Sequence, residues 1–399
     1  MRRSIGVLLL AAAVWAGSAW ADESWDFAGS VDLQSRWFTQ DARWVGQEDR
    51  VGQFSIAVSA EARWRSADGR RRASFIPYLR WDDTDDERSL FDLREAHVAW
   101  EGSGWEFLAG SNVVFWGVTE SVHLVDIINQ TDAVADIDGE DKFGQPMLNL
   151  TLQRDWGLLG IFVMPYFRER SFAGPDGRFR TPLPVDTDRA WFESSAEENN
   201  VDLALRYSHY FGDVDLGVSL FSGTSREPRL QPDATGTALL PHYDRIDQLG
   251  VDLQVTRDAW LWKLETILRN GYADSFAAAV GGFEYTFYQV RETTADVGVL
   301  LEYQYDGRAA TEPATIADND LFAGARLALN DSQDTAILAG FALDLETGET
   351  LFNVEAERRL GNDYVIELRA RFFTGAGPGE LTWAVARDDY LQLQLSRYF

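Results

Sequence analysis

The segment 389–399, DYLQLQLSRYF, decides the fold because its residues alternate between apolar and polar. Successive side chains of a β-strand point to opposite faces, so one face of this strand is apolar and the other is polar. Such a strand suits the wall of a closed barrel that has lipid outside and water inside. The apolar face consists of Leu391, Leu393, Leu395 and Phe399, and the polar face carries Gln392, Gln394 and Ser396.

This segment resembles the carboxy-terminal targeting strand of Gram-negative outer-membrane proteins, which alternates apolar residues and ends on Phe. The resemblance implies that the barrel-assembly machinery reads the strand during insertion. Arg397 departs from the pattern, because that family usually has an aromatic or apolar residue at this position. Near the periplasmic edge, its guanidinium can extend into the lipid headgroups.

The amino-terminal segment has the features of a secretory signal peptide. Two arginines precede the apolar run 5–16, and an A-x-A pattern ends at Ala21. A membrane-spanning helix needs about 20 apolar residues, and this run is shorter. We therefore expect passage through the secretion translocon and cleavage between Ala21 and Asp22, which removes residues 1–21 and leaves residues 22–399 as a single domain.

Composition narrows the class of protein. No later apolar stretch is long enough for a membrane helix, although aromatics make up 13% of the residues and include 15 Trp. A barrel reconciles the two, since each strand needs only about 9–11 residues and only every second one faces lipid. The absence of cysteine excludes both disulfides and a lipid anchor on an N-terminal Cys. The net charge of −28 makes nucleic acid an unlikely partner.

Alternating segments can be followed along almost the whole mature chain, and we count eighteen. An even number is required if both termini lie in the periplasm. Sixteen is the alternative, because Pro77 interrupts one segment and the apolar face switches near Arg94 in the next. The expected strands are 27–38, 54–65, 72–81, 91–100, 105–115, 147–154, 158–167, 201–211, 214–222, 248–257, 260–270, 276–290, 295–305, 321–330, 335–345, 351–360, 364–373 and 390–399.

The connections between these segments fall into two length classes. Short turns rich in Gly, Asp and Asn, such as 212–213, alternate with longer, more acidic connections such as 117–146, 168–200 and 223–247. A soluble β-sandwich has no reason to show this asymmetry. The sequence therefore predicts an all-β, antiparallel, up-and-down transmembrane barrel.

Charged residues alternate with the apolar ones and are expected to line the lumen. They form either the charged wall of a conduction path or a salt-bridged lining that keeps the wall rigid and hydrated. Opposite charges on the two strands near residues 355 and 369 should pair across the sheet. The candidates are Arg206, Glu355, Glu357, Arg359, Glu367, Arg369 and Arg371.

The third long connection, residues 117–146, is expected to fold toward the lumen and narrow it, as in general porins. Val118, Val122, Val125 and Ile128 have a spacing near that of a helix, which Thr119 or the nearby Ser121 is placed to cap. So many apolar residues would not remain exposed, so we expect them to pack against the inner wall or near the rim. The acidic candidates for a constriction are Asp126, Asp132, Asp136, Asp138, Glu140 and Asp141.

Two other interpretations of this acidic run remain open. Asp136, Asp138 and Glu140 suggest a calcium site, since hard cations take clustered carboxylates, but the match to the EF-hand loop is poor. The run is otherwise a solvated loop that faces lipopolysaccharide. No cofactor is predicted.

A second resemblance concerns the same loop. The pattern W-G…D-x-x-N-x-x-D, formed by Trp116, Gly117, Asp126, Asn129 and Asp132, resembles uncharacterised porin-like barrel families of Gram-negative bacteria. Those families have no assigned substrate, so the resemblance implies the fold and a porin-like role only.

The sequence contains no recognisable catalytic motif. There is no G-x-S-x-G, no H-E-x-x-H and no Cys nucleophile. We therefore expect an outer-membrane channel for passive diffusion of small polar or ionic solutes. The alternatives are a non-conducting structural or envelope-assembly barrel closed by its loops, and a barrel hydrolase that uses one of the four histidines. These are His97, His123, His209 and His242.

The expected environment follows from this interpretation. The partners are outer-membrane lipid and lipopolysaccharide, with the assembly machinery and the translocon acting during biogenesis. A homo-oligomer is compatible with the sequence.

Deletion of Phe399 should reduce insertion into the outer membrane, because the resemblance makes this residue part of the signal that the assembly machinery reads. The measurement is the amount of folded, heat-modifiable protein in outer-membrane fractions. Normal amounts after the deletion would contradict the targeting role.

Overall fold

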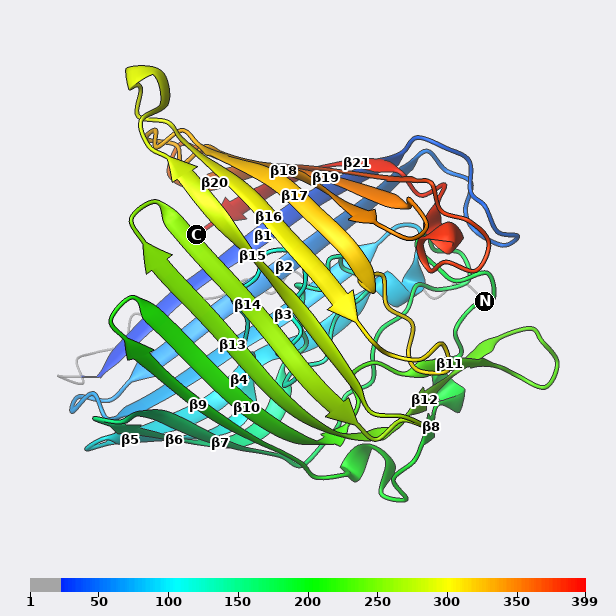
Figure 1. Ribbon diagram of the computed structural model, residues 1–399. Coiled ribbons are helices and arrows are strands. Elements are labelled where there is room, and N and C mark those ends of the chain that lie inside the picture. Colours follow the sequence, from blue (N-terminus) through cyan, green and yellow to red (C-terminus); the bar gives the residue numbers. More distant parts are fainter. Residues whose placement is uncertain (1–22) are drawn as a thin grey trace.

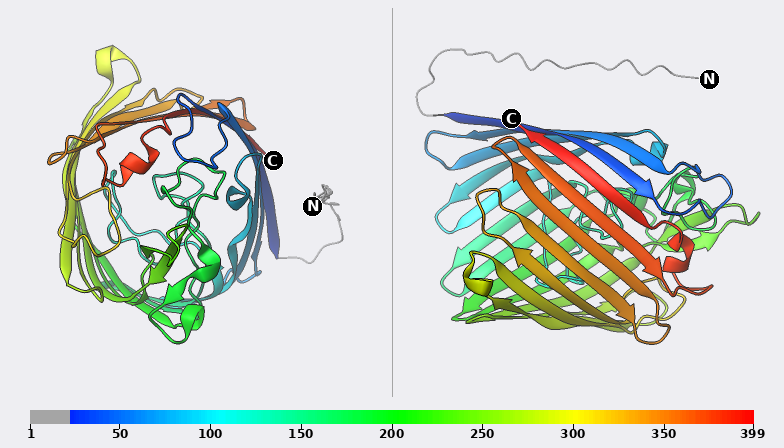
Figure 2. Two further views of the ribbon diagram at one scale, coloured as in Figure 1. Left: turned by 90° about the vertical axis from the view of Figure 1, so that its right-hand side faces the viewer. Right: turned by 90° about the horizontal axis from the view of Figure 1, so that it is seen from above.

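The structure is a computed structural model that describes residues 23–399, so the predicted signal peptide and its cleavage site at Ala21 and Asp22 lie outside the described residues. Eighteen antiparallel strands form one sheet, and β1 pairs with both β2 and β21, which closes it into a barrel (Figures 1 and 2). The closed sheet has no free edge. The prediction of an 18-stranded antiparallel barrel is confirmed.

The barrel strands agree with most of the predicted ranges to within a few residues. They are β1 (Ser24–Phe38), β2 (Gly52–Arg65), β3 (Arg71–Asp82), β4 (Leu90–Gly102), β5 (Trp105–Asn112), β6 (Gln145–Arg154), β7 (Gly157–Met164), β9 (Asp202–Phe211), β10 (Val214–Thr224), β13 (Arg245–Arg257), β14 (Trp260–Asn270), β15 (Phe276–Phe287), β16 (Asp296–Asp306), β17 (Asn319–Ala328), β18 (Ala336–Asp344), β19 (Thr350–Leu360), β20 (Tyr364–Thr374) and β21 (Tyr390–Tyr398).

Small elements lie in the connections between these strands. Three short strands form a separate sheet within the two long connections that follow β7 and β10, where the sequence predicted only loops. Among residues 23–399, no helix has the length and apolar content needed to cross a membrane. The small elements are β8 (Trp191–Phe192), β11 (Arg229–Pro232), β12 (Leu239–Tyr243) and the single-turn helices η1 (Asp86–Arg88), η2 (Thr187–Arg189), η3 (Glu197–Asn199), η4 (Val290–Glu292) and η5 (Thr382–Val385).

The irregularities at Pro77 and near Arg94, which left sixteen strands as an alternative, have a local explanation. The register between β3 and β4 shifts at Ile76 and Pro77, so the strands contain a β-bulge there and both remain in the sheet. The alternative of sixteen strands is therefore wrong. The strand expected over 276–290 ends early, at Phe287, because Gln289 adopts a left-handed φ of 52° and the chain turns there.

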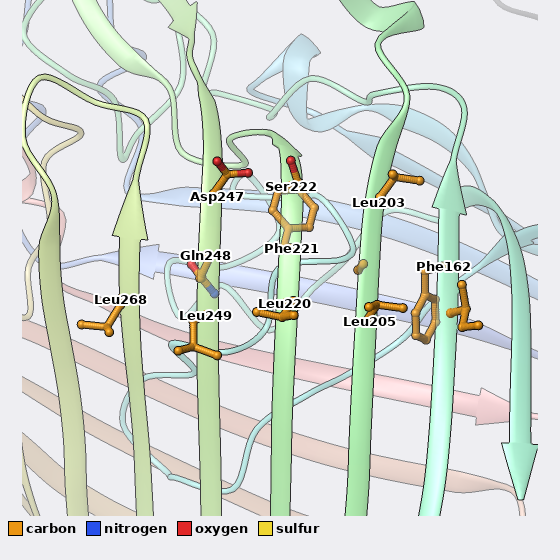
Figure 3. A pocket seen from close by; sticks show the side chains of 12 residues that line it. Phe162, Leu203, Leu205, Leu220, Phe221, Ser222, Asp247, Gln248, Leu249 and Leu268 are labelled. Carbon is orange, nitrogen blue, oxygen red and sulfur yellow. The ribbon is translucent and has the colours of Figure 1, made fainter.

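The barrel wall has two chemically different faces. Leu205, Leu220, Leu249 and Leu268 are 37–56% exposed and lie in a row across four neighbouring strands, where they outline a shallow apolar depression on the outer face (Figure 3). Phe221, which follows Leu220 along β10, is only 3% exposed and belongs to the opposite face. This period-two alternation gives the barrel an apolar exterior over a polar, filled interior.

The long connections and the short turns lie at opposite ends of the barrel (Figure 1). In the view along the barrel, segments of the long connections fill much of the space inside the ring of strands (Figure 2). One turn at the short-turn end, residues 288–295, is longer than the others and carries η4. The wall is therefore a scaffold whose loops are gathered at and inside one mouth.

The seam of the barrel depends on a close approach between Gly29 of β1 and Phe399. The two residues exchange backbone hydrogen bonds of 3.0 and 3.1 Å. A Cβ on Gly29 would lie 2.8 Å from the Phe399 ring and 2.8 Å from the carbonyl oxygen of Ser59. Only glycine fits here without moving the last residue or the neighbouring strand.

The variant Gly29→Val should lower the thermal stability of the barrel, because the added carbons would displace the Phe399 ring and open the β1–β21 seam. We expect a lower temperature for the heat-modifiability shift on gels. Gly52→Ala is the matched control, since its Cβ would meet Trp37 at an ordinary 3.6 Å. Equal stability of the two variants would show that the seam tolerates the displacement.

Candidate functional site

The third outer loop, residues 113–144, crosses the lumen in two lobes. The first lobe, residues 116–128, reaches β13, β14 and β16, on the opposite side of the barrel from the point where the loop leaves β5. The second lobe, residues 132–141, reaches β1, β3, β20 and β21. The loop therefore touches the wall on several sides, which a loop exposed above the mouth does not do.

One buried carboxylate on β14 holds the first lobe. Glu265 is 0% exposed, and its oxygens accept hydrogen bonds from the backbone N–H groups of Val118, Thr119 and Val125 at 2.7, 3.1 and 3.2 Å. The Thr119 hydroxyl donates a further bond at 2.7 Å. Because a buried charge is costly unless its acceptor positions are filled, this set of donors fixes the position of the loop.

A second carboxylate, Glu302 of β16, continues the same arrangement and is 2% exposed. It accepts the backbone N–H groups of Glu120 and Ser121, each at 2.9 Å. The expected helix does not form in this segment, and the N–H group of Val125, which a helix would direct to the carbonyl one turn earlier, binds Glu265 instead. That expectation was wrong because apolar spacing alone does not show where the backbone hydrogen bonds go.

The apolar residues of the first lobe pack inside the barrel. Val125, Ile127 and Ile128 are 0–3% exposed and join inward-facing residues of the wall in one cluster. This hydrophobic core joins the loop to the inner wall along β4–β15. Its wall members are Ala99, Leu108, Met147, Phe162, Met164, Ala204, Phe221, Ile246, Ile267, Phe276 and Ala278.

The second lobe is held by ion pairs. Asp136 accepts from Arg369 Nη1 at 2.6 Å and from the Tyr390 hydroxyl at 3.1 Å, and Arg371 bridges it to Asp138, 2.8 Å away. Burial opposes ionisation of Asp136, but the neighbouring arginines hold its pKa well below its usual range. Burial and the charge of Asp136 raise the pKa of Asp138 to about 6.

These contacts bear on the calcium hypothesis for Asp136, Asp138 and Glu140. Guanidinium groups fill the positions around the first two carboxylates where a cation would bind, and Glu140 pairs with His123. Within residues 23–399, no three His, Asp or Glu side chains converge as metal ligands.

The other acidic candidates of the loop anchor it as well. Asp132 is 0% exposed and lies 3.2 Å from both Arg80 and Arg94. Asp126 pairs with Lys142 at 3.1 Å, and burial raises the pKa of Asp126. Burial also raises the pKa of Asp141, whose backbone oxygen accepts the Asp132 N–H at 2.8 Å.

A histidine ties the two lobes together. His123 Nε2 lies 3.0 Å from Glu140, and His123 Nδ1 lies 3.7 Å from Glu265. Burial lowers the pKa of His123, but the two carboxylates outweigh burial and raise it to about 10. Sequence reasoning missed this link, because a single His in a loop of unknown conformation carries no signal of its partners.

Among residues 23–399, the ion pair between Glu120 and Arg326 is the one polar contact of the loop with the inner wall on β17–β19. We call this region the open sector. Its inward side chains retain exposure: the Arg326 side chain is 42% exposed and the Glu355 side chain 34%. On the loop side, Glu140 is 51% exposed, while Glu120 accepts from Arg326 at 2.7 Å. The open sector therefore carries both signs of charge and water-accessible polar groups.

The other charged residues predicted to line the lumen lie partly under the loop and partly in or beside the open sector. Arg206 pairs with Asp252 at 2.8 Å beneath Trp116 and lies under the loop. Glu355 pairs with Arg371 at 3.1 Å across β19 and β20, as the expected cross-strand pairing requires. Arg359 instead pairs with Asp334, at 2.9 Å.

One part of the cross-strand expectation was wrong. Glu357 lies directly opposite Glu367 in the β19–β20 register, so two like charges face each other. The sequence pattern placed acidic and basic residues on both strands but did not fix their register.

Comparisons with known proteins agree with this architecture. No protein-family model and no curated protein sequence matches the chain. Among solved structures, it is similar to Wzi of Escherichia coli, with a TM-score of 0.54 and 8% identity over 94% of this chain and 84% of that one. It is also similar to OccAB1 of Acinetobacter baumannii, with a TM-score of 0.55 and 9% identity over 94% and 96%. At these identities the similarity shows the fold, and that fold is the outer-membrane β-barrel.

Proposed function

We propose that this protein is an outer-membrane channel for passive diffusion of small polar or ionic solutes, with a passage narrowed by the third loop. The observation that carries the proposal is the difference between the two halves of the lumen. Along β4–β15 the inner wall packs against the loop in an apolar core, whereas inward side chains in the open sector remain partly exposed. A barrel that served only as a rigid anchor would have no need of an uncovered, charged sector.

The apolar residues on the outer face of the barrel support a location in the outer membrane. The large apolar residues exposed on the outer face, among them Leu205, Leu249 and Leu391, would be unfavourable in water and are favourable in lipid. Inward-facing charges such as Arg326 need water or ion partners, which a hydrated passage supplies.

The position of the constriction follows from the loop. Glu120, His123 and Glu140 form its side toward the open sector, and Arg326 faces them from β17. Charged side chains on both sides of a narrow passage orient polar solutes and set ion preference. The loop and the β17–β19 wall would together form the narrowest part of the route.

A closed envelope-assembly barrel is the second candidate. The outer loops are tied to each other, since Arg178 pairs with Asp388 at 2.6 Å and Arg180 donates to the Val45 carbonyl at 2.6 Å. The structure of Wzi, which is similar in fold, is described as a carbohydrate-binding barrel involved in capsule assembly. Such contacts between the outer loops would suit a closed barrel. A measurement of single-channel conductance distinguishes the two candidates.

The hydrolase alternative gains no support from the described residues. Among residues 23–399, no histidine contacts a serine hydroxyl, and His97 Nδ1 lies 3.3 Å from the backbone oxygen of Ser111. Outer-membrane lipid, lipopolysaccharide, the assembly machinery and self-association remain the proposed partners.

Removal of the second lobe should enlarge the passage. Thr131 and Lys142 pair as a β-bridge, so the ends of residues 133–140 lie close enough for Gly-Gly to replace them. We expect a clear rise in single-channel conductance in planar bilayers, because the lobe spans the lumen between the loop base and Asp136's partners on β20.

The matched control replaces residues 234–237, the tip between β11 and β12, with Gly-Gly, since Asp233 N–H donates to the Ala238 carbonyl at 2.9 Å there. This control should leave the conductance unchanged. A silent membrane for the native protein would overturn the channel proposal in favour of the closed barrel.

Loss of the ion pair between His123 and Glu140 should make the third loop less ordered at high pH. The pKa of His123 is raised to about 10, so the stabilisation is complete below about pH 6.5 and is lost as pH rises through 10. We expect current noise to increase above pH 10, and Glu140→Gln to move that onset to lower pH. An identical pH profile for both proteins would contradict the role of the link.

A further inference from the structure

We propose that the channel favours cations, and that Glu357 and Glu367 on the inner wall set this preference. The inference rests on the proposed diffusion function and names the class of solute that the same passage prefers. Both residues lie on β19 and β20, beside the open sector and toward the short-turn end of the barrel.

The two carboxylates face each other in the sheet. Glu357 and Glu367 are direct partners in the β19–β20 register, on the inward face that also carries Glu355 and Arg369. Like charges directly opposite each other destabilise an antiparallel pair. Asp32 adds a third carboxylate on the inward face of β1, which is joined to β20 through β21.

In the part of the chain that the structure describes, this group has one basic partner, and that contact is long. Among residues 23–399, Glu357 and Asp32 form no ion pair, and the nearest base to Glu367 is Arg369 Nη2 at 3.8 Å. Arg369 already donates to Asp136 at 2.6 Å, so its charge is shared. The other contact of Glu367 is the neutral Gln394 amide at 3.3 Å.

The bases that border the open sector are engaged elsewhere. Six of them have a carboxylate partner in the loop, in the wall or in a turn, with Glu120 shared by two, and Arg36 of β1 is buried against Gln392 and the Ala135 carbonyl, so none of them pairs with Glu357 or Asp32. The pairs are Arg326–Glu120, Lys263–Glu120, Arg371–Asp138, Arg369–Asp136, Arg359–Asp334 and His123–Glu140.

Uncompensated carboxylates in a narrow, low-dielectric passage raise the local concentration of cations and lower that of anions. Acidic side chains lining a pore select cations for this reason. Glu357 is exposed to the lumen and the Glu367 side chain is 21% exposed, so both act on ions in water within the passage.

The experiment measures the reversal potential of the full-length protein in planar bilayers under a KCl gradient kept near 0.1 M, where screening leaves the charges effective over about 10 Å. We expect the native channel to favour K⁺ over Cl⁻. The double variant Glu357→Gln/Glu367→Gln should lower the K⁺/Cl⁻ permeability ratio roughly threefold. The variant should fold, because it removes a like-charge contact.

The matched control is Glu292→Gln/Asp363→Asn, which removes the same charge from two turns at the same end of the barrel, outside the strands. It should keep the native ratio, which separates a local effect from the net charge of the protein. The heat-modifiability shift checks that each variant is folded.

The possible outcomes separate the two proposals. Currents without cation preference, or a double variant that keeps the native ratio, would overturn this inference and leave the channel intact. An equal shift in the control would also overturn it, because bulk charge would then explain the effect. The absence of any current from native protein would overturn the channel proposal and this inference with it.

Discussion

The burial of Glu265 and Glu302 against the backbone of the third loop is the constraint on which the arrangement of the lumen depends. A carboxylate without exposure loses hydration that is worth several kcal/mol per ion. Each recovers this cost through N–H and hydroxyl donors of the loop, and hydrogen bonds to charged groups contribute about 1.5–3 kcal/mol apiece. The loop needs the same acceptors, since its own backbone makes no helix. Wall and loop therefore stabilise each other.

This mutual dependence divides the lumen into two chemically different halves. The carboxylates place the first lobe so that Val125 and Ile128 meet the inward apolar residues of the wall in a buried core. The second lobe uses the opposite chemistry, with Asp132 and Asp136 bound to arginines on the far side. In the described chain, the wall of β17–β19 meets the loop through the Arg326–Glu120 pair alone, so inward side chains such as Glu355 keep part of their exposure there.

The sequence was sufficient for the barrel but not for its contents. Period-two alternation in strands such as β9 and β21 predicted the strand number, because each strand must present one face to lipid. The apolar spacing of Val118, Val122 and Val125 was misread as a helix. The competing hydrogen bonds come from Glu265 and Glu302, more than a hundred residues away, and no local pattern reports them.

The sequence alone could not predict which charges of the inner wall face each other, because this depends on the strand register. The acidic and basic residues of β19 and β20 looked evenly mixed, yet a shift of one residue decides whether a base faces an acid. In the observed register, Asn353 faces Arg371, which leaves this arginine free for Asp138, whereas Glu357 faces Glu367. The bases are thus drawn to the loop and hold it in place. The carboxylates of Glu357 and Glu367 are left facing each other, so in the proposed channel the anchoring of the loop and the cation preference would have one origin.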